Sequence, residues 1–230
     1  MTAEKKFTLD RILPFLAVLA LPLSLFPVAG DWGWWQGWTF LGTNVLFSAL
    51  SRGLVAKKHP GLLRERASFI GNQGTKAWDK KLVPAVVLLP LLIMVVAALN
   101  RRLGWLPPVP LWLQLLGLAG MLLSMAASTW AMLVNRFFSS VVRIQTERGH
   151  TVVSDGPYRV VRHPGYAGSI LGEICIPFLL GSYWALIPAL LVIAAVILRT
   201  ALEDRTLQAE LPGYREYAGR VRYRLFPGLW

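Results

Sequence analysis

Residues 156–168 have the sequence Gly156-Pro157-Tyr158-Arg159-Val160-Val161-Arg162-His163-Pro164-Gly165-Tyr166-Ala167-Gly168. This stretch is polar and rich in glycine and proline, whereas the chain around it is mostly apolar. One long apolar segment precedes it, and two others follow it at close spacing. We therefore expect the apolar segments to hold this loop at a membrane surface, and we expect the chemistry of the protein to take place there.

The overall composition is typical of an integral membrane protein. Hydrophobic residues make up 55% of the 230 residues and charged residues make up 16%, compared with about 25% charged residues in soluble domains. Several apolar runs are long enough to cross a bilayer. These features predict an all-α membrane protein that forms one structural domain.

The charge is strongly positive, with 24 Lys and Arg against 12 Asp and Glu. The basic residues lie between the apolar runs, as the positive-inside rule predicts. Membrane topology and anionic lipid headgroups therefore explain the charge better than nucleic-acid binding does. The single cysteine, Cys175, lies in an apolar run, so no intrachain disulfide can form. We expect membrane lipids as partners, with no nucleic acid and no obligate protein partner.

The apolar runs predict about six transmembrane helices. They cover residues 12–29, 38–55, 82–99, 111–134, 166–180 and 184–198. The first run could also be a signal peptide, but the spans that follow favour an uncleaved helix. Each of the last two runs rises only about 23 Å, less than the roughly 30 Å hydrocarbon core. We expect them to form a tight C-terminal helical hairpin.

The distribution of charge predicts the orientation. Of the 24 basic residues, only Arg101 and Arg102 fall in the short turns on one side of the membrane. The other side should be cytoplasmic and should hold both termini, which suggests a multi-pass protein of a bacterial inner membrane. Residues 1–134 would then hold four spans and a cytoplasmic loop at 56–81. Residues 135–230 would hold the 156–168 loop, the hairpin and a cytoplasmic pocket.

Two local patterns indicate how the chain is organised around this loop. The span at 111–134 carries a row of small residues, including Gly117, Gly120 and Ser124, which favours close packing against another helix. Pro164 suits the first position of a helix, because its missing N–H would have no partner there. The helix N-terminus, with Arg162 and His163, could bind a carboxylate or a phosphate, or could simply anchor lipid headgroups.

Three acidic residues are candidates for function. Glu173 lies seven residues after Tyr166 in an apolar run, where a carboxylate costs about 2.5–3.5 kcal/mol and needs a functional or a structural partner. Glu203 and Asp204 follow the last apolar run. A helix over 184–208 would be about 37 Å long and would bring them back towards the 156–168 loop. They could bind a ribose diol or an ammonium group, or could be solvated acids.

Several motifs are missing. The sequence contains no HExxH or paired Cys/His set for a metal, no nucleophile elbow and no Walker or Rossmann fingerprint. We therefore expect no metal site. A reaction that needs mainly positioning, such as SN2 transfer from an already activated donor, fits such a chain.

The loop resembles the RHPxY signature of isoprenylcysteine carboxyl methyltransferases and their phospholipid methyltransferase relatives, and it is similar to the bacterial branch of that family. The residues that carry the resemblance are Tyr158, Arg162, His163, Pro164 and Tyr166. It extends over roughly residues 135–227, with a weaker likeness at 60–79.

The resemblance implies S-adenosylmethionine as the methyl donor, bound from the cytosol. The cofactor-binding residues that it implies are Tyr158, Arg162, His163, Pro164, Tyr166, Glu203 and Asp204. By analogy, His163 and the helix N-terminus would hold the cofactor carboxylate, and Glu203 its ribose or amine. Asp204 replaces a second Glu that is often found there.

The methyl acceptor would be lipophilic and would enter from the bilayer. A carboxylate, as in an isoprenylcysteine, is already ionised and needs no base. An amine or a thiol must lose a proton, which His150 or Glu173 could accept. The expected catalytic residues are therefore Glu173, Arg162 and His150.

Two other functions are consistent with parts of the sequence. Membrane reductases of the steroid 5α-reductase-like type use NADPH and resemble this chain in their hairpin, but the intact RHPxY sequence and Tyr158 favour a methyltransferase. A transporter or scaffold is a third possibility. A transporter should carry polar residues on several mid-membrane helix faces, and only Glu173 is such a residue.

Overall fold

The computed structural model describes residues 23–67, 74–105 and 107–230. In these residues all regular structure is helical, as expected. The helices are α2 (Leu25–Ala29), α3 (Trp35–Lys58), α4 (Pro60–Ala67), α5 (Ala77–Leu103), α6 (Leu111–Val134), α7 (Pro164–Leu179), α8 (Leu186–Glu210) and α9 (Tyr214–Arg220), with short 3-10 helices η1 (Thr146–Arg148) and η2 (Gly156–Arg159).

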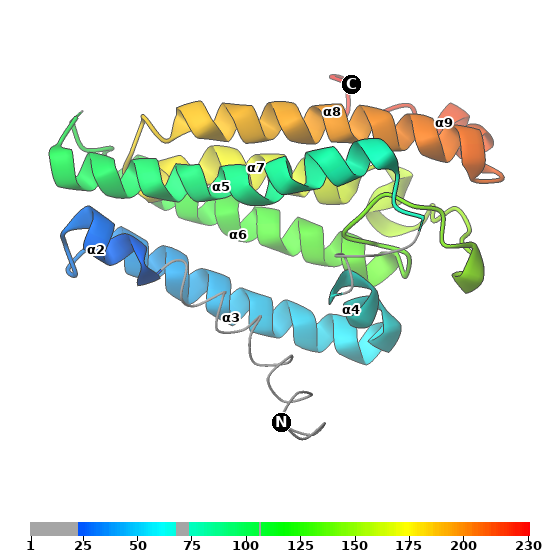
Figure 1. Ribbon diagram of the computed structural model, residues 1–230, viewed down its shortest axis with the longest axis horizontal. Helices are drawn as coiled ribbons and strands as arrows, with labels where there is room; N and C mark the ends of the chain where they lie inside the picture. The colour runs from blue at the N-terminus through cyan, green and yellow to red at the C-terminus, as the bar shows by residue number, and fades with distance from the viewer. Residues whose placement is uncertain (1–22, 68–73, 106) are drawn as a thin grey trace.

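The long helices form a bundle in which α5, α6, α7 and α8 run side by side and α3 lies along one edge (Figure 1). The loops between α6 and α7 gather with α4 and α9 at one end of this bundle (Figure 1). The shared core includes Phe26, Ile93, Met121, Leu179 and Val192, which are all nearly inaccessible to solvent. The end with the long loops is therefore the part of the molecule where polar side chains can gather.

Three of these helices, α5, α6 and α8, are long and apolar enough to cross a membrane. With the apolar composition, they support an integral membrane protein. The expected span at 38–55 falls within α3, and the expected span at 166–180 corresponds to α7. Most of the expected span at 12–29 lies outside the described residues. The count of six spans, the orientation and the two-region division at residue 134 stay predictions.

Helices α6 and α7 make the most extensive contact between described helices, and small residues cause it. A methyl group added at Gly172 would lie 2.6 Å from Ser124 Oγ, and one added at Gly117 would lie 2.6 Å from the backbone nitrogen of Leu179. The expected small-residue face of α6 is thus confirmed. This close approach holds α7, which begins directly after the 162–163 pair, firmly against the bundle.

Replacement of Gly172 by Leu is expected to lower the free energy of unfolding by about 1–3 kcal/mol, because the added atoms overpack the α6–α7 contact. Thermal unfolding in detergent measures the effect. The control is Gly42→Leu in α3, where an added methyl group meets nothing within 4 Å, and where loss of a helical glycine should be neutral or stabilising. Equal melting temperatures for the two variants would contradict this account of the packing.

Helix α8 has 25 residues and is about 37 Å long, as the sequence predicted for this segment. It carries Glu203 and Asp204 back to the 156–168 loop, where Tyr166 and Arg162 contact them. The expected return of the acidic pair to this loop is therefore confirmed.

A buried ion pair fixes α8 to α5 and to the loop after α6. Asp79 of α5 is fully buried and accepts hydrogen bonds from Arg199 Nε at 2.7 Å and from the backbone N–H of Val142 at 2.7 Å. Arg199 also donates to the carbonyl oxygen of Ser140 at 2.9 Å. One carboxylate thus joins three segments that are distant in sequence.

Candidate functional site

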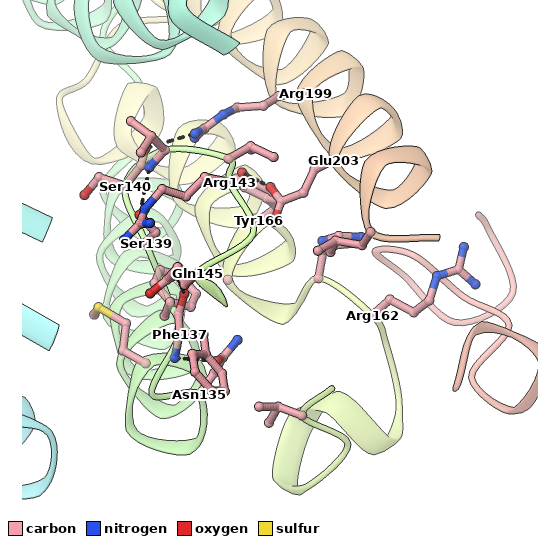
Figure 2. Close-up of a pocket in the computed structure, with 18 of the residues that line it drawn as sticks. Asn135, Phe137, Ser139, Ser140, Arg143, Gln145, Arg162, Tyr166, Arg199 and Glu203 are labelled. Carbon is pink, nitrogen blue, oxygen red and sulfur yellow. Dashed lines mark hydrogen bonds between the residues drawn. The ribbon is translucent and has the colours of Figure 1, made fainter. Parts of the chain in front are cut away.

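A cavity of about 410 Å³ lies where the α6–α7 loops meet α5 and α8. Its size is within the usual range for small-molecule sites. The charged and polar aromatic side chains in its wall are Arg66, Arg143, His150, Tyr158, Arg162, His163, Tyr166, Arg199, Glu203, Tyr214 and Tyr217. Most of the residues expected from the sequence are therefore brought together around one cavity. Figure 2 shows part of this wall, with Tyr166 and Glu203 side by side.

The start of α7 has the local structure that its sequence predicts. Pro164 is the first residue of the helix and His163 is the N-cap residue. The backbone N–H groups of Arg162 and His163 donate to the carbonyl oxygens of Tyr223 and Arg224, at 3.0 and 2.9 Å. The loop is thus paired with the C-terminal segment, and these two donors are not available to a ligand.

Arg162 makes a buried clamp. Its Nε and Nη2 atoms donate to Asp204 at 2.7 and 3.0 Å, and its Nη1 atom donates to the carbonyl oxygens of Val221 and Arg222 at 2.9 and 3.0 Å. Figure 2 shows the Arg162 guanidinium turned away from Tyr166 and Glu203. Although Arg162 lines the cavity, its donors hold α8 and the C-terminal segment in place.

Asp204 is fully buried and lies behind the cavity wall, since it is absent from the lining. Besides Arg162, four side chains bond to it: Arg224 at 2.9 Å, Gln208 at 2.7 Å, Tyr214 at 3.2 Å and His163 at 3.3 Å. This arrangement satisfies the carboxylate within the protein. In this geometry Asp204 joins the loop, α8 and the C-terminal segment, which is a structural role. Its expected contact with the cofactor stays a prediction.

Tyr166 and Glu203 face the cavity. The Tyr166 hydroxyl donates to Glu203 Oε2 at 2.6 Å, and Oε1 accepts no hydrogen bond from the described residues. The Arg199 guanidinium carbon lies 5.6 Å from the centre of the Tyr166 ring, and the His163 ring stacks on Tyr166 with the ring centres 5.9 Å apart. Glu203 is the one acidic residue that the described part of the chain places in the wall. It is suited to bind a cation or a diol.

Tyr158 lies in the short helix η2 and is fixed at both of its oxygens. Its hydroxyl accepts a hydrogen bond from Asn135 Nδ2 at 3.2 Å, and its carbonyl oxygen accepts one from the Tyr217 hydroxyl at 2.8 Å. Burial raises the pKa of Tyr158 well above its usual value, so the phenol is neutral at physiological pH. Together these bonds fix an aromatic ring in the cavity wall.

The surroundings of His150 hold its imidazole ring in one protonation state and one tautomer. Its Nδ1 atom accepts a hydrogen bond from the backbone N–H of Gln145 at 3.3 Å, and its ring centre lies 4.5 Å from that of Phe137. Burial, and then the nearby charges of Arg143 and Arg148, lower the pKa of His150 to about 4. The ring is therefore neutral at pH 7, with its proton on Nε2, and offers no free lone pair to an acceptor.

Acid is expected to destabilise the wild-type protein more than a His150→Gln variant. The unfolded chain has a His pKa of about 6.5, whereas the pKa of folded His150 is about 4. Between these values the unfolded chain binds a proton that the folded chain does not, so the free energy of unfolding falls as the pH falls through this range. Melting temperatures at pH 7.5 and 5 measure the effect. The same pH slope in both proteins would contradict it.

Glu173 is not part of the cavity wall. It lies two turns along α7 from Tyr166, and its buried Oε2 atom has no hydrogen-bond partner among the described residues. The structure therefore does not bring Glu173 to the residues around Glu203. Its expected catalytic role stays a prediction that the geometry does not favour.

The residues around this cavity match a known family. Residues 115–209 match the family model described as isoprenylcysteine carboxyl methyltransferase (ICMT). This part of the chain is similar to the ICMT family. The matched region contains His150, Tyr158, the Arg162–Tyr166 loop and Glu203. The family expectation from the sequence is confirmed.

The chain is also similar to two individual proteins. The chain is 29% identical over 172 residues to the cobalt-zinc-cadmium resistance protein CzcN of Cupriavidus metallidurans, covering 73% of this chain and 70% of that protein. Its fold is similar to that of the eukaryotic intramembrane Ras methyltransferase ICMT. The TM-score is 0.54 at 18% sequence identity, over 92% of this chain and 73% of that one. At this identity, the second likeness concerns the fold alone.

Part of the cavity wall lies outside the ICMT-matched region. Sequence reasoning assigned no role in the site to Arg66, which lines the cavity and precedes the match, or to Arg199, which lines it within the match. It also missed Asp79, which is not in the lining but pairs with Arg199. The sequence contains a signal for Asp79, since it is the only acid among the lysines of residues 76–81, directly before an apolar run. No comparable signal distinguishes Arg66 from the other basic residues of that segment.

Proposed function

We propose that the protein is an integral membrane methyltransferase that transfers a methyl group from S-adenosylmethionine to a lipophilic acceptor. The observation that carries this proposal is the Tyr166–Glu203 pair, which presents a carboxylate to the cavity within the ICMT-family region. The acceptor would enter from the bilayer, and the cofactor from the cytoplasmic side, in a protein of a bacterial inner membrane.

The residues in the cavity fit S-adenosylmethionine. Tyr166 bonds to Glu203 Oε2, and Oε1 has no hydrogen-bond partner among the described residues, so it can accept hydrogen bonds from a ribose diol or an ammonium group. The rings of Phe137, Tyr158 and Tyr166 provide aromatic surface for a purine or a sulfonium cation. The volume of about 410 Å³ suits a molecule of this size. When bound, the cofactor supplies an activated methyl group.

Each residue of the loop has a proposed role in holding the cofactor. Tyr166 orients the Glu203 carboxylate, and Tyr158 and His163 contribute ring surface beside it. Arg162 and Pro164 act on the shape of the site, because Arg162 clamps α8 to the loop and Pro164 sets the start of α7. The chain's contribution to catalysis is then alignment of donor and acceptor, which can supply much of the rate enhancement of such a transfer.

The lack of a free general base other than Glu203 among the described residues of the cavity favours a methyl acceptor that is already ionised. His150 uses its Nδ1 lone pair in the bond from Gln145, and Glu173 lies away from the cavity. An amine or a thiol would therefore lack a free base other than Glu203 among the described residues. We propose a carboxylate, as in an isoprenylcysteine-like compound, as the acceptor group.

A reductase is less consistent with this cavity. NADPH carries phosphate groups that need several free cations. Of the four arginines in the wall, Arg143, Arg162 and Arg199 are already bonded to carboxylates. The aromatic and acidic surface around Glu203 suits a cationic cofactor better.

The test combines binding and turnover. Isothermal titration of the purified protein in detergent is expected to show binding of S-adenosylhomocysteine and none of NADPH. Incubation with methyl-labelled cofactor, extracted lipids and an S-farnesylcysteine derivative, followed by mass spectrometry, is expected to show a labelled methyl ester. Binding of NADPH without S-adenosylhomocysteine would overturn the proposed function.

A further inference from the structure

Four arginines line the cavity, and their partners differ. Arg143 bonds to Glu65 at 2.9 Å, Arg162 to Asp204 at 2.7 Å and Arg199 to Asp79 at 2.7 Å. Arg66, from the last turn of α4, bonds to no acid among the described residues. The segment that follows it, 68–73, contains no acidic residue in its sequence. Arg66 is thus the cavity arginine without a counter-ion in the described part of the chain.

The position of Arg66 is fixed by its surroundings. Its guanidinium carbon lies 5.3 Å from the centre of the Phe138 ring, and its carbonyl oxygen accepts a hydrogen bond from the Ser140 hydroxyl at 3.3 Å. The preceding residue, Glu65, anchors α4 by bonding to Arg143 and to the Ser139 hydroxyl. The guanidinium is therefore oriented before any ligand arrives, which lowers the entropic cost of binding.

The electrostatic environment makes an anion favourable beside Arg66. Burial lowers the pKa of Arg66; the nearby Tyr166 hydroxyl acts in the opposite direction, and the positive charges of Arg199 and Arg52 lower it further. A guanidinium nevertheless stays protonated in proteins. No acid among the described residues pairs with this partly buried cation, which is costly, and a ligand that brings a negative charge removes that cost.

We propose that Arg66 binds the negatively charged head of the methyl acceptor, a carboxylate or a phosphate, and so determines acceptor specificity. The inference rests on the proposed function, in which Glu203 takes the cationic cofactor. The cavity then has an acidic part for the donor and a basic part for the acceptor. Arg66 lies outside residues 115–209, the region matched to the family model, so the proposed specificity depends on the position of α4.

Direct binding of an acceptor probe, without cofactor, tests the inference. The probes are N-acetyl-S-farnesylcysteine and its carboxamide, which lacks the negative charge. Wild-type protein is expected to bind the carboxylate more tightly, and Arg66→Gln is expected to weaken that binding about tenfold or more while leaving the carboxamide unaffected. Arg66→Lys should restore part of the affinity. The control is Arg64→Gln, which removes a cation outside the cavity wall from the same helix and should bind as wild type.

Melting temperature, S-adenosylhomocysteine affinity and vesicle competition distinguish a binding role of Arg66 from a structural one. Arg66→Gln should keep the wild-type melting temperature and S-adenosylhomocysteine affinity; a lower melting temperature with equal loss of both probes would indicate a structural role and overturn the inference. Equal carboxylate binding by the Arg64→Gln and Arg66→Gln variants would also overturn it. Competition by phosphatidylglycerol vesicles that depends on Arg66 would support the subsite and assign a phosphate as the anion. Absence of methyl transfer, with these binding results intact, would count against the proposed function alone.

Discussion

Asp204→Asn is expected to lower the free energy of unfolding by about 3–5 kcal/mol, because it leaves the buried guanidinium of Arg162 without a counter-ion. Both residues are almost inaccessible to solvent, and their two hydrogen bonds are 2.7 and 3.0 Å long. Arg224 loses its carboxylate partner in the same substitution. An isosteric amide cannot compensate, since its NH₂ group would face these donors.

The loss of the Asp204 carboxylate should weaken contacts throughout the end of the molecule that holds the cavity. Asp204 also accepts from Tyr214 of α9 and from Gln208 of its own helix. Through Arg162 it is connected to the carbonyl oxygens of the segment after α9. We therefore expect Asp204→Asn to lower affinity for S-adenosylhomocysteine indirectly, by loosening the loop that carries Tyr166.

Thermal unfolding in detergent, followed by tryptophan fluorescence, measures the stability change. Asp155→Asn is the matched control, because Asp155 pairs with Arg159 at 3.1 Å on the surface, with 77% of its side chain exposed. Such pairs contribute about 0–1 kcal/mol. If the Asp204→Asn variant melted at the same temperature as the Asp155→Asn control, the buried network would not support the fold in the proposed way.

The helical architecture follows from local rules that the sequence displays. The apolar runs predict long helices, Pro164 predicts the start of α7, and the small residues of the 111–134 run predict its close contact with another helix. The length of the last helix also predicts that Glu203 returns to the loop of Arg162. These features depend on neighbours along the chain or on a helix face, so a single sequence is sufficient for them.

The different roles of Glu203 and Asp204 depend on helix geometry. Neighbouring residues on an α-helix point about 100° apart, and here the two carboxylates take different directions. Glu203 faces Tyr166, and Asp204 faces the C-terminal segment. An adjacent acidic pair in the sequence does not specify which of the two takes which direction.

The choice of ionic partners is the part that could not be predicted. Asp79 and Arg199 are 120 positions apart and are brought together only by packing of α5 on α8. Arg162 was expected to offer donors to a ligand, but a buried carboxylate 42 positions away takes them. Glu173 shares a helix with Tyr166, yet the cavity ends before it. Pairing over such distances depends on the tertiary structure, which local patterns do not describe.

Glu203→Gln is expected to weaken S-adenosylhomocysteine binding by roughly 10- to 100-fold, because it replaces charge-assisted hydrogen bonds of about 1.5–3 kcal/mol with neutral ones. The amide can still accept a hydrogen bond from Tyr166, so the cavity should keep its shape. Isothermal titration measures the affinity. Methyl transfer at saturating acceptor should fall at least as much, since the donor would be bound less often and less well aligned.

Glu210→Gln is the control for this substitution. Glu210 lies on the same helix, two turns further on, where it pairs with Lys76 near the surface and 43% of its side chain is exposed. Its loss removes the same charge from α8 without touching the cavity, so affinity should stay within about twofold of wild type. If the Glu203→Gln variant bound S-adenosylhomocysteine as tightly as the Glu210→Gln control, with an unchanged melting temperature, the cofactor could not be held by Glu203. The assignment of the acidic part of the cavity to the methyl donor would then fail, even if Arg66 still bound an anion.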